Sequence, residues 1–207
     1  MREHEINKLN NFMMGWYLDD TSACDKMIQI FNDHQKDVVD GFIGSYGYVD
    51  TNIKQSKDLH FHPQSFETLK YGNIVKDCAK LYVQKYDRAL CTGVYPVEGF
   101  NIQYYDVGGG FKTWHDERQS ADYPSVARHL VFMTYLNDVD DGGTEFLHQN
   151  ITIKAEKGLT LIWPADWTFT HRSQVSLTKQ KWIATGWLHL LRIKDNEDKQ
   201  VNTIKGL

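Results

Sequence analysis

The sequence has 207 residues, of which 41% are apolar and 24% are charged, and its formal net charge is −4. This composition is ordinary for a globular protein. The mild acidity and the lack of a long basic run argue against nucleic acid as a partner, and no apolar run approaches the 18 residues of a membrane span. Cys24, Cys78 and Cys91 are too scattered for a disulfide framework, and the polar N-terminal stretch has no apolar signal core, so we expect a cytoplasmic location.

The first hundred residues predict a helical layer. Residues 11–18 predict a strand, and residues 19–35 predict a helix because their apolar residues recur three and four positions apart. Residues 41–65 are interrupted by glycine and polar residues, so we expect them to be irregular. Residues 65–88 predict a second helix.

After residue 100 the sequence changes to short apolar or alternating runs separated by turn residues. The runs are NIQYYDV, FKTWHDE, RHLVFMTYLND, ITIKAE, GLTLIWP, WTFTHRS and KWIATGWLHLLRI, and the breaks are GGG, DVDDGG, EKG and PAD. Strands at this spacing predict an all-β sandwich or barrel, with DVDDGG as a solvated hairpin turn. We expect a single domain over residues 1–207, with a helical support region (1–100), a β core (101–191) and a polar tail (192–207).

A candidate metal site begins at His115, which is followed by two carboxylates, Asp116 and Glu117. If FKTWHDE is a strand, alternate side chains share a face, so Glu117 and not Asp116 lies beside His115. Two histidines and one carboxylate form the ligand set that holds non-haem Fe(II) and leaves coordination positions open. The best second histidine is His171, where an apolar run meets a polar turn. We expect the other later histidines to be solvated or to lie in the core: His129, His148 and His189.

From about residue 101 to residue 190 the sequence resembles the prolyl 4-hydroxylase-like branch of the Fe(II)/2-oxoglutarate dioxygenases. The features that carry the resemblance are Tyr105, His115-x-Glu117, TYLNDV with Tyr135, DGGTEF, EKGLTLIWP, His171, Lys181, and KWIATGW with Thr185 and Trp187. The order and the spacing of these features both match the family. One feature departs from it, because the usual carboxylate is Asp and this chain has Glu117, whose extra methylene requires a compensating shift of about 1 Å.

The resemblance implies an α+β fold in which a double-stranded β-helix, or jelly roll, has the N-terminal helices packed on one sheet. It also implies an oxidoreductase that uses Fe(II), O2 and the cosubstrate 2-oxoglutarate, with ascorbate as a reductant. The implied reaction hydroxylates a peptidyl proline and releases succinate and CO2. The implied metal ligands are His115, Glu117 and His171.

The resemblance assigns roles to four further residues. Lys181 would bind the distal carboxylate of 2-oxoglutarate, and the hydroxyls of Tyr135 and Thr185 would complete that anion pocket. Tyr105 would lie beside the metal-side carboxylate of the cosubstrate or beside the substrate. These roles follow from the positions of the residues relative to His115 and His171.

Several alternatives remain open at the level of sequence. Asp116 could be the metal carboxylate if a kink brought consecutive side chains to one face. The substrate could be a free amino acid or another small molecule instead of a peptide. The domain could also be a non-catalytic ligand-binding jelly roll, or a zinc hydrolase that uses the same three ligands. No feature of the sequence specifies an oligomeric state.

Overall fold

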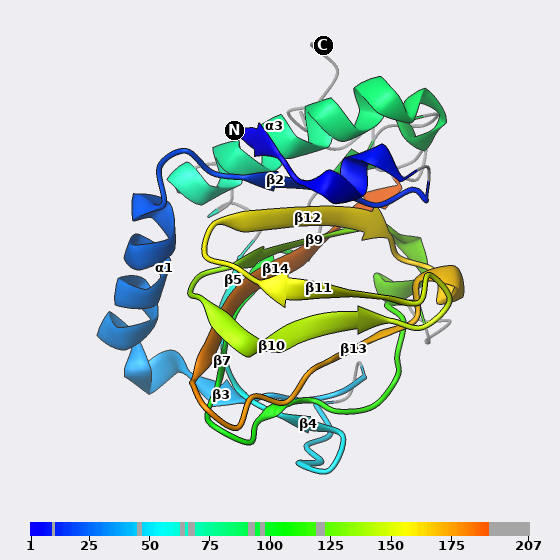
Figure 1. The fold of residues 1–207 in the computed structure, drawn as a ribbon. Helices are drawn as coiled ribbons and strands as arrows, with labels where there is room; N and C mark the ends of the chain where they lie inside the picture. The colour runs from blue at the N-terminus through cyan, green and yellow to red at the C-terminus, as the bar shows by residue number, and fades with distance from the viewer. Residues whose placement is uncertain are drawn as a thin grey trace.

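Antiparallel strands form two sheets that pack face to face (Figure 1). The computed structural model describes residues 1–9, 11–44, 47–62, 65, 69–90, 94–95, 98–118 and 123–190. Among these residues the larger sheet has the strand order β1 (Arg2–Glu3), β2 (Met14–Tyr17), β12 (Leu159–Pro164), β9 (Arg128–Tyr135), β14 (Lys181–Leu190), β7 (Phe100–Tyr105), β5 (Lys57–Phe61) and β3 (Val39–Asp40), with β6 (Val94–Tyr95) paired to β14.

The smaller sheet lies across one face of the larger one. Its order is β11 (Ile151–Ala155), β10 (Val139–Phe146) and β13 (His171–Ser173), and a separate two-stranded sheet joins β4 (Lys54–Gln55) to β8 (Gly110–Phe111). The two main sheets share one apolar cluster, in which Phe146 and Ile153 of the smaller sheet pack with Met133 and Leu161 of the larger. This is the jelly-roll arrangement that the resemblance implied.

Among the described residues two α-helices cover the other face of the larger sheet, as predicted. They are α1 (Ser22–Asp33) and α3 (Lys70–Lys85), and Figure 1 shows α3 running along the edge that contains β2. In α3 the buried residues Tyr71, Val75, Cys78 and Tyr82 recur on one side of the helix, which gives it an apolar face toward the sheet. The Tyr71 hydroxyl donates to Thr134 Oγ1 at 3.1 Å, so its polar group is satisfied inside this layer.

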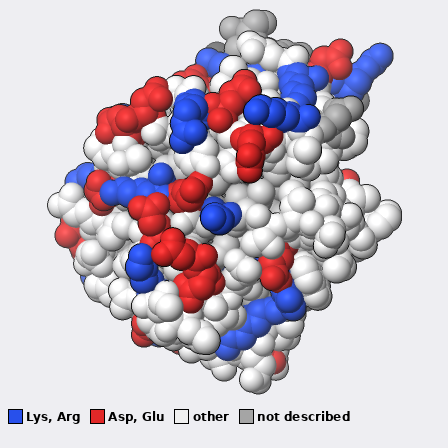
Figure 2. All heavy atoms as spheres, in the orientation of Figure 1, with Lys and Arg blue, Asp and Glu red and all other residues white. Residues whose placement is uncertain are grey.

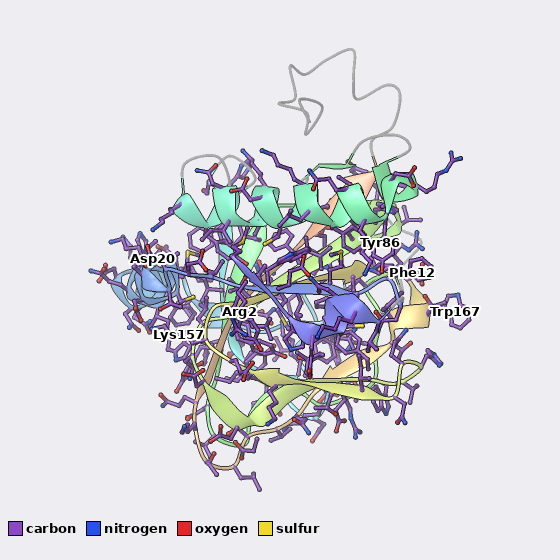
Figure 3. All side chains as sticks on the ribbon, turned by 45° about the horizontal axis from the view of Figure 1, so that its top comes forward. Arg2, Phe12, Asp20, Tyr86, Lys157 and Trp167 are labelled. Atoms are coloured by element: carbon purple, nitrogen blue, oxygen red, sulfur yellow. The ribbon has the colours of Figure 1, made fainter. Side chains whose placement is uncertain are left out.

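Short 3-10 helices connect these elements: η1 (Glu5–Lys8), η2 (Gln35–Asp37), η3 (Asp87–Leu90), η4 (Ser125–Ala127) and η5 (Trp167–Phe169). At one end of the molecule Phe12 and Tyr86 lie side by side, with ring centroids 5.3 Å apart (Figure 3). This contact joins the segment before β2 to the end of α3. Among the described residues no helix combines the length and the apolar character needed to cross a membrane.

Strand β14 shows how the larger sheet separates its two faces. Trp182 faces the helices and meets the Phe31 ring edge-on at 4.9 Å, whereas Lys181 and Ile183 line the interior between the sheets. This alternation is the period of two expected of a strand with both faces covered. On the surface shown in Figure 2, acidic and basic side chains are interspersed.

The prediction that DVDDGG is a hairpin turn is wrong, because most of this segment lies in strand β10. Its pairing with β11 shifts register between Val139 and Thr144. A Cβ at Gly143 would lie 2.4 Å from the Ile153 carbonyl oxygen, and a Cβ at Gly142 would lie 2.5 Å from a Val139 methyl group. The glycines therefore allow close packing at a β-bulge and do not mark a chain reversal.

Three other expectations need correction. Residues 41–65, expected to be irregular, contain β4 and β5. FKTWHDE is not a continuous strand, since only β8 and an isolated bridge at His115 have β structure there. His171 does not end a strand but begins β13, directly after η5. The predicted polar tail, Cys91 and residues 66–68 of the second predicted helix lie outside the described residues.

Candidate active site

The two histidines singled out in the sequence are paired through their backbones. His115 and His171 form an isolated antiparallel bridge, with N–H to carbonyl oxygen distances of 3.0 and 2.9 Å. Their ring centroids lie 4.4 Å apart. A single pair of backbone hydrogen bonds thus brings together two residues that are 56 positions apart in the sequence.

Both imidazoles direct Nε2 toward a common point. The Nδ1 atom of His115 lies 3.0 Å from the Thr113 carbonyl oxygen, and that of His171 lies 2.9 Å from the Phe169 carbonyl oxygen. Because a carbonyl only accepts, Nδ1 carries a proton in each ring, which leaves Nε2 as the nitrogen that can bind a metal. Burial, together with the neighbouring His171, lowers the pKa of His115 to about 3, so this ring is a neutral donor.

Glu117 completes the group, and Asp116 does not. Glu117 Oε1 lies 3.5 Å from Nε2 of His171 and 4.0 Å from Nε2 of His115. Burial alone would raise the pKa of Glu117, but the two histidines and Arg128 lower it to about 2, which keeps it ionised. Asp116 instead accepts the backbone N–H of Arg118 at 3.0 Å within the turn that follows.

These three side chains fit a divalent transition metal. One potential ligand atom from each of His115, Glu117 and His171 lies within 4.8 Å of the other two. Two imidazole nitrogens and one carboxylate oxygen supply borderline donors and one neutralising charge, the set that suits Fe(II) with open positions for further ligands. The same three donors would also accept Zn(II), so the donor set alone does not choose between the oxygenase and hydrolase interpretations.

The triad lies in a cavity of about 710 Å³ that also contains Lys181. The Lys181 side chain is almost fully buried, with 3% of the residue exposed. Its Nζ donates to the carbonyl oxygens of Gly142 at 2.8 Å and Gln174 at 3.1 Å, and to the Ser173 hydroxyl. Burial lowers the pKa of Lys181 to about 8, with a small opposing effect from Asp141.

A second buried lysine in the same cavity has a different environment. Lys54 forms a 2.6 Å ion pair with Asp58, and the two residues are 5% and 1% exposed. Lys181 takes part in none of the ion pairs found between described residues. The nearby carboxylate of Asp141 accepts hydrogen bonds from the 176–178 turn instead. Lys181 therefore presents the unneutralised buried ammonium of this cavity, which is the environment that an anion needs.

The other three residues that were predicted to bind the cosubstrate all line the cavity. Tyr135 and Tyr105 line the cavity, and their hydroxyls bond to Thr144 Oγ1 and Gln103 Oε1, each at 2.6 Å. Thr185 also lines the cavity, but its hydroxyl donates to the Phe132 carbonyl at 3.0 Å. It lies four residues beyond Lys181 on β14, or roughly 13 Å along the strand. The roles predicted for these residues stay predictions.

Sequence reasoning missed a group of charged residues behind the triad. Arg128 forms a bidentate ion pair with Glu98, at 2.6 and 2.5 Å, and Glu98 also lies 2.6 Å from His189 Nε2. We expected His189 to be a satisfied core residue; it is fully buried and Nε2 has this partner, but its buried Nδ1 has no hydrogen-bond partner among the described residues. His129 matches the same expectation, with Nε2 2.8 Å from the Ala89 carbonyl oxygen. An arginine at the start of an apolar strand was the one available signal.

Comparisons with known proteins agree with this geometry. Residues 100–189 match the family model described as the 2OG-Fe(II) oxygenase superfamily. No curated protein matches the chain. Many solved structures do, and those below share its fold at low sequence identity.

Three of these structures are prolyl hydroxylases. A prolyl 4-hydroxylase from Pseudomonas putida is 14% identical, with a TM-score of 0.64 over 90% of this chain and 97% of that one. A Trichoplax adhaerens prolyl hydroxylase, in complex with a hypoxia inducible factor peptide, is 14% identical, with a TM-score of 0.67 over 89% and 87%. A viral collagen prolyl hydroxylase from Paramecium Bursaria Chlorella virus-1 is 17% identical, with a TM-score of 0.63 over 88% and 98%.

The matched residues contain β7, β9 and nearly all of β14, which contribute to the cavity wall, together with all three members of the triad and Lys181. The fold, the donor set and the family match therefore agree, and they favour an oxygenase over a zinc hydrolase. Over residues 100–189 the chain matches the 2OG-Fe(II) oxygenase superfamily, and this match together with the His/Glu/His triad identifies a 2-oxoglutarate-dependent dioxygenase that uses Fe(II).

Proposed function

We propose that this enzyme hydroxylates a peptidyl proline, with His115, Glu117 and His171 as the ligands of Fe(II) and Lys181 as the anchor of 2-oxoglutarate. The observation that carries the proposal is the buried, unneutralised ammonium of Lys181 in the same cavity as the triad. A binding module without chemistry would have no need to maintain two adjoining sites, one for a metal and one for an anion. We further propose that residues 1–207 form one domain, with a helical support region (1–100), a β core (101–191) and a polar tail (192–207).

Bound Fe(II) and 2-oxoglutarate would supply the oxidising chemistry, with release of succinate and CO2 and with ascorbate as a reductant. The protein residues bind and orient. Lys181 would hold the distal carboxylate by a charge-assisted hydrogen bond. The Tyr135 hydroxyl, on the strand paired with β14, would be a second donor. Tyr105 lies in register with Lys181 on the other neighbouring strand, which supports its place beside the cosubstrate.

The peptide substrate is supported by the fold likeness to prolyl hydroxylases, one of which is in complex with a peptide. The cavity also has partly exposed aromatic residues, Phe42 and Trp114, that could receive an apolar ring. Arg172 packs over the Trp114 indole at 4.4 Å and holds it in place. An apolar ring flanked by backbone amides, as in a peptidyl proline, matches these features.

A second candidate substrate is a free amino acid or another small polar molecule. One cavity wall, formed by β5 and β7, presents polar side chains in cross-strand register, with Asp58 opposite Gln103 and His60 opposite Asn101. His60 Nδ1 lies 2.6 Å from Asn101 Oδ1. Such a wall offers hydrogen bonds to a compact polar substrate.

A turnover screen separates these candidates. Purified enzyme with Fe(II), ascorbate and 2-oxoglutarate would be incubated with proline-containing peptides or with free amino acids, and succinate and a +16 product would be measured together. We expect substrate-dependent succinate with a hydroxylated peptide, and neither product with His171→Ala. A +16 product only on free amino acids would support the second candidate. Absence of succinate under every condition, in folded and metal-loaded protein, would support the non-catalytic module.

We also propose the cytoplasm as the compartment. The support is that Cys24 and Cys78 are both free and buried. Free thiols are typical of a reducing environment.

A further inference from the structure

The two oxygens of Glu117 have different surroundings. Oε1 faces Nε2 of both histidines, at 3.5 and 4.0 Å. Oε2 accepts the indole N–H of Trp187 at 2.9 Å and lies 3.6 Å from Nη1 of Arg128. One oxygen is therefore turned toward the metal position, and the other is already bonded to the protein.

Arg128 is itself fixed on three sides. Its Nε and Nη2 atoms bond to the two carboxylate oxygens of Glu98 at 2.6 and 2.5 Å, and its Nη1 donates to the backbone carbonyl of Glu117 at 3.0 Å. Its guanidinium carbon lies over the Trp187 ring, 3.6 Å from the centroid. A planar fork can make all these contacts at once, whereas an ammonium cannot.

Strand β14 supports the far end of this group. His189 lies two residues after Trp187, is fully buried, and places Nε2 2.6 Å from Glu98 Oε1. Arg128 is paired with Glu98 and also lies 3.6 Å from Glu117 Oε2, so it supports the ionised carboxylate and leaves Oε1 free for a cation. Glu98, Arg128, Trp187 and His189 thus form one group that supports Glu117 through the direct contacts of Arg128 and Trp187, and we call it the Glu117 brace.

We infer that the brace holds Glu117 as a one-oxygen ligand through Oε1, and that it is what allows a glutamate to serve at this position. This inference rests on the proposed role of the triad. Glutamate has one more rotatable bond than aspartate, so a free carboxylate would lose more conformational entropy on binding a metal or would offer both oxygens. Trp187 and Arg128 remove that freedom before the metal arrives. An aspartate with the same backbone could not reach both the metal and the indole.

Metal titration of the whole chain tests the inference without turnover. Co(II) would be added anaerobically to metal-free protein, and its dissociation constant and visible d–d spectrum would be recorded. Trp187→Phe keeps an aromatic ring and removes the indole N–H. In this variant we expect Co(II) to bind about tenfold more weakly and its d–d spectrum to change. Trp182→Phe is the matched control, since Trp182 lies on the same strand but packs on the helix side. It should leave both readouts unchanged.

Two further variants test the brace: Glu98→Gln changes the partner of Arg128, and Glu117→Asp changes the ligand that the brace holds. Glu98→Gln keeps the size of a residue that does not touch Glu117, so a changed Co(II) spectrum would be specific to positioning through Arg128. Glu117→Asp should bind Co(II) more weakly than the natural protein. Thermal unfolding of each metal-free variant identifies a misfolded protein. If Trp187→Phe is misfolded, Glu98→Gln provides the decisive measurement.

The outcomes distinguish the brace from the metal site itself. If His171→Ala leaves Co(II) binding unchanged, the proposed triad is wrong and the brace is wrong with it. If His171→Ala abolishes binding while folded Trp187→Phe and Glu98→Gln bind with natural affinity and spectrum, the triad stands and the brace is overturned. Unchanged affinity in Glu117→Asp would overturn the claim that the brace favours glutamate.

Discussion

His115 and His171 face each other across a single antiparallel bridge, and each accepts the backbone N–H of the other. Residues paired in this way project their side chains to the same side of the sheet, so backbone pairing sets the separation of the two rings. The chain leaves the bridge at once, because the N–H of Glu117 bonds to the Ala165 carbonyl at 3.2 Å. This departure turns Glu117 back toward the rings and explains why a continuous strand is not needed to form the triad.

Removal of His171 should abolish the metal chelate. The wild-type protein with Fe(II) and 2-oxoglutarate, without oxygen, should show the weak visible charge-transfer band of the chelate, and His171→Ala should lack it. Two ligands in place of three cannot hold the ion at micromolar concentration in competition with water. His148→Ala is the control, since His148 is exposed and does not line the cavity. A normal band in His171→Ala would contradict the proposed triad.

Sequence reasoning found the β core because most of its strands are covered on both faces or alternate between apolar and polar neighbours. RHLVFMTY and KWIATGWLHL fall within β9 and β14, the two central strands beside the cavity. The order and spacing of His115, His171 and Lys181 were readable because they resemble those of a known family. Strand periodicity alone would not have joined them, because His171 begins β13 in the smaller sheet and Lys181 begins β14 in the larger one.

The features that sequence reasoning missed depend on contacts between residues that a local sequence pattern does not display. β5 was missed because Lys57–Phe61 begins with two charged residues, and only the structure shows that Asp58 is buried against Lys54. Gly142 and Gly143 were misread because glycine more often marks a turn than a close approach. The Glu117 brace joins residues 30 and 70 positions apart, whose pairing no local pattern records.

Loss of the Lys181 ammonium should weaken 2-oxoglutarate binding. In Lys181→Met we expect KM for 2-oxoglutarate to rise roughly a hundredfold, about 3 kcal/mol, because a buried charge pair is lost. Co(II) affinity should remain close to that of the natural protein, since Lys181 does not contact the triad. Lys179→Met, an exposed site two residues away, is the control. An unchanged KM would show that the distal carboxylate binds elsewhere.

The pH dependence of 2-oxoglutarate binding should follow the same lysine. Burial lowers the pKa of Lys181 from 10.5 to about 8, so KM should rise as pH increases through that value and the ammonium is lost. Lys181→Met should show no such rise.

As pH rises, 2-oxoglutarate binding should weaken, whereas the free energy of unfolding of the ligand-free protein should increase. Between about pH 8 and 10.5 the unfolded chain holds the Lys181 proton and the folded protein does not, so the contribution of Lys181 to the free energy of unfolding increases with pH. Below pH 8 the full cost of burying the ammonium is present. Urea unfolding at pH 7 and pH 9.5, compared between the natural protein and Lys181→Met, measures this contribution; equal pH slopes would contradict the shifted pKa.

Breaking the Lys54–Asp58 pair should destabilise the fold much more than breaking an exposed pair. In Asp58→Asn the Lys54 ammonium stays buried without its carboxylate, and we expect a loss of roughly 3–5 kcal/mol in the free energy of unfolding, measured in urea. Asp40→Asn is the matched control, because the Lys57–Asp40 pair is equally short but its side chains are 55% and 61% exposed. It should cost less than about 1 kcal/mol.

Lys54→Met combined with Asp58→Leu should recover most of the loss, since two apolar side chains of similar volume leave no buried charge. If Asp58→Asn cost no more than Asp40→Asn, water would have to reach the pair, and the polar wall of the cavity would be solvated instead of closed.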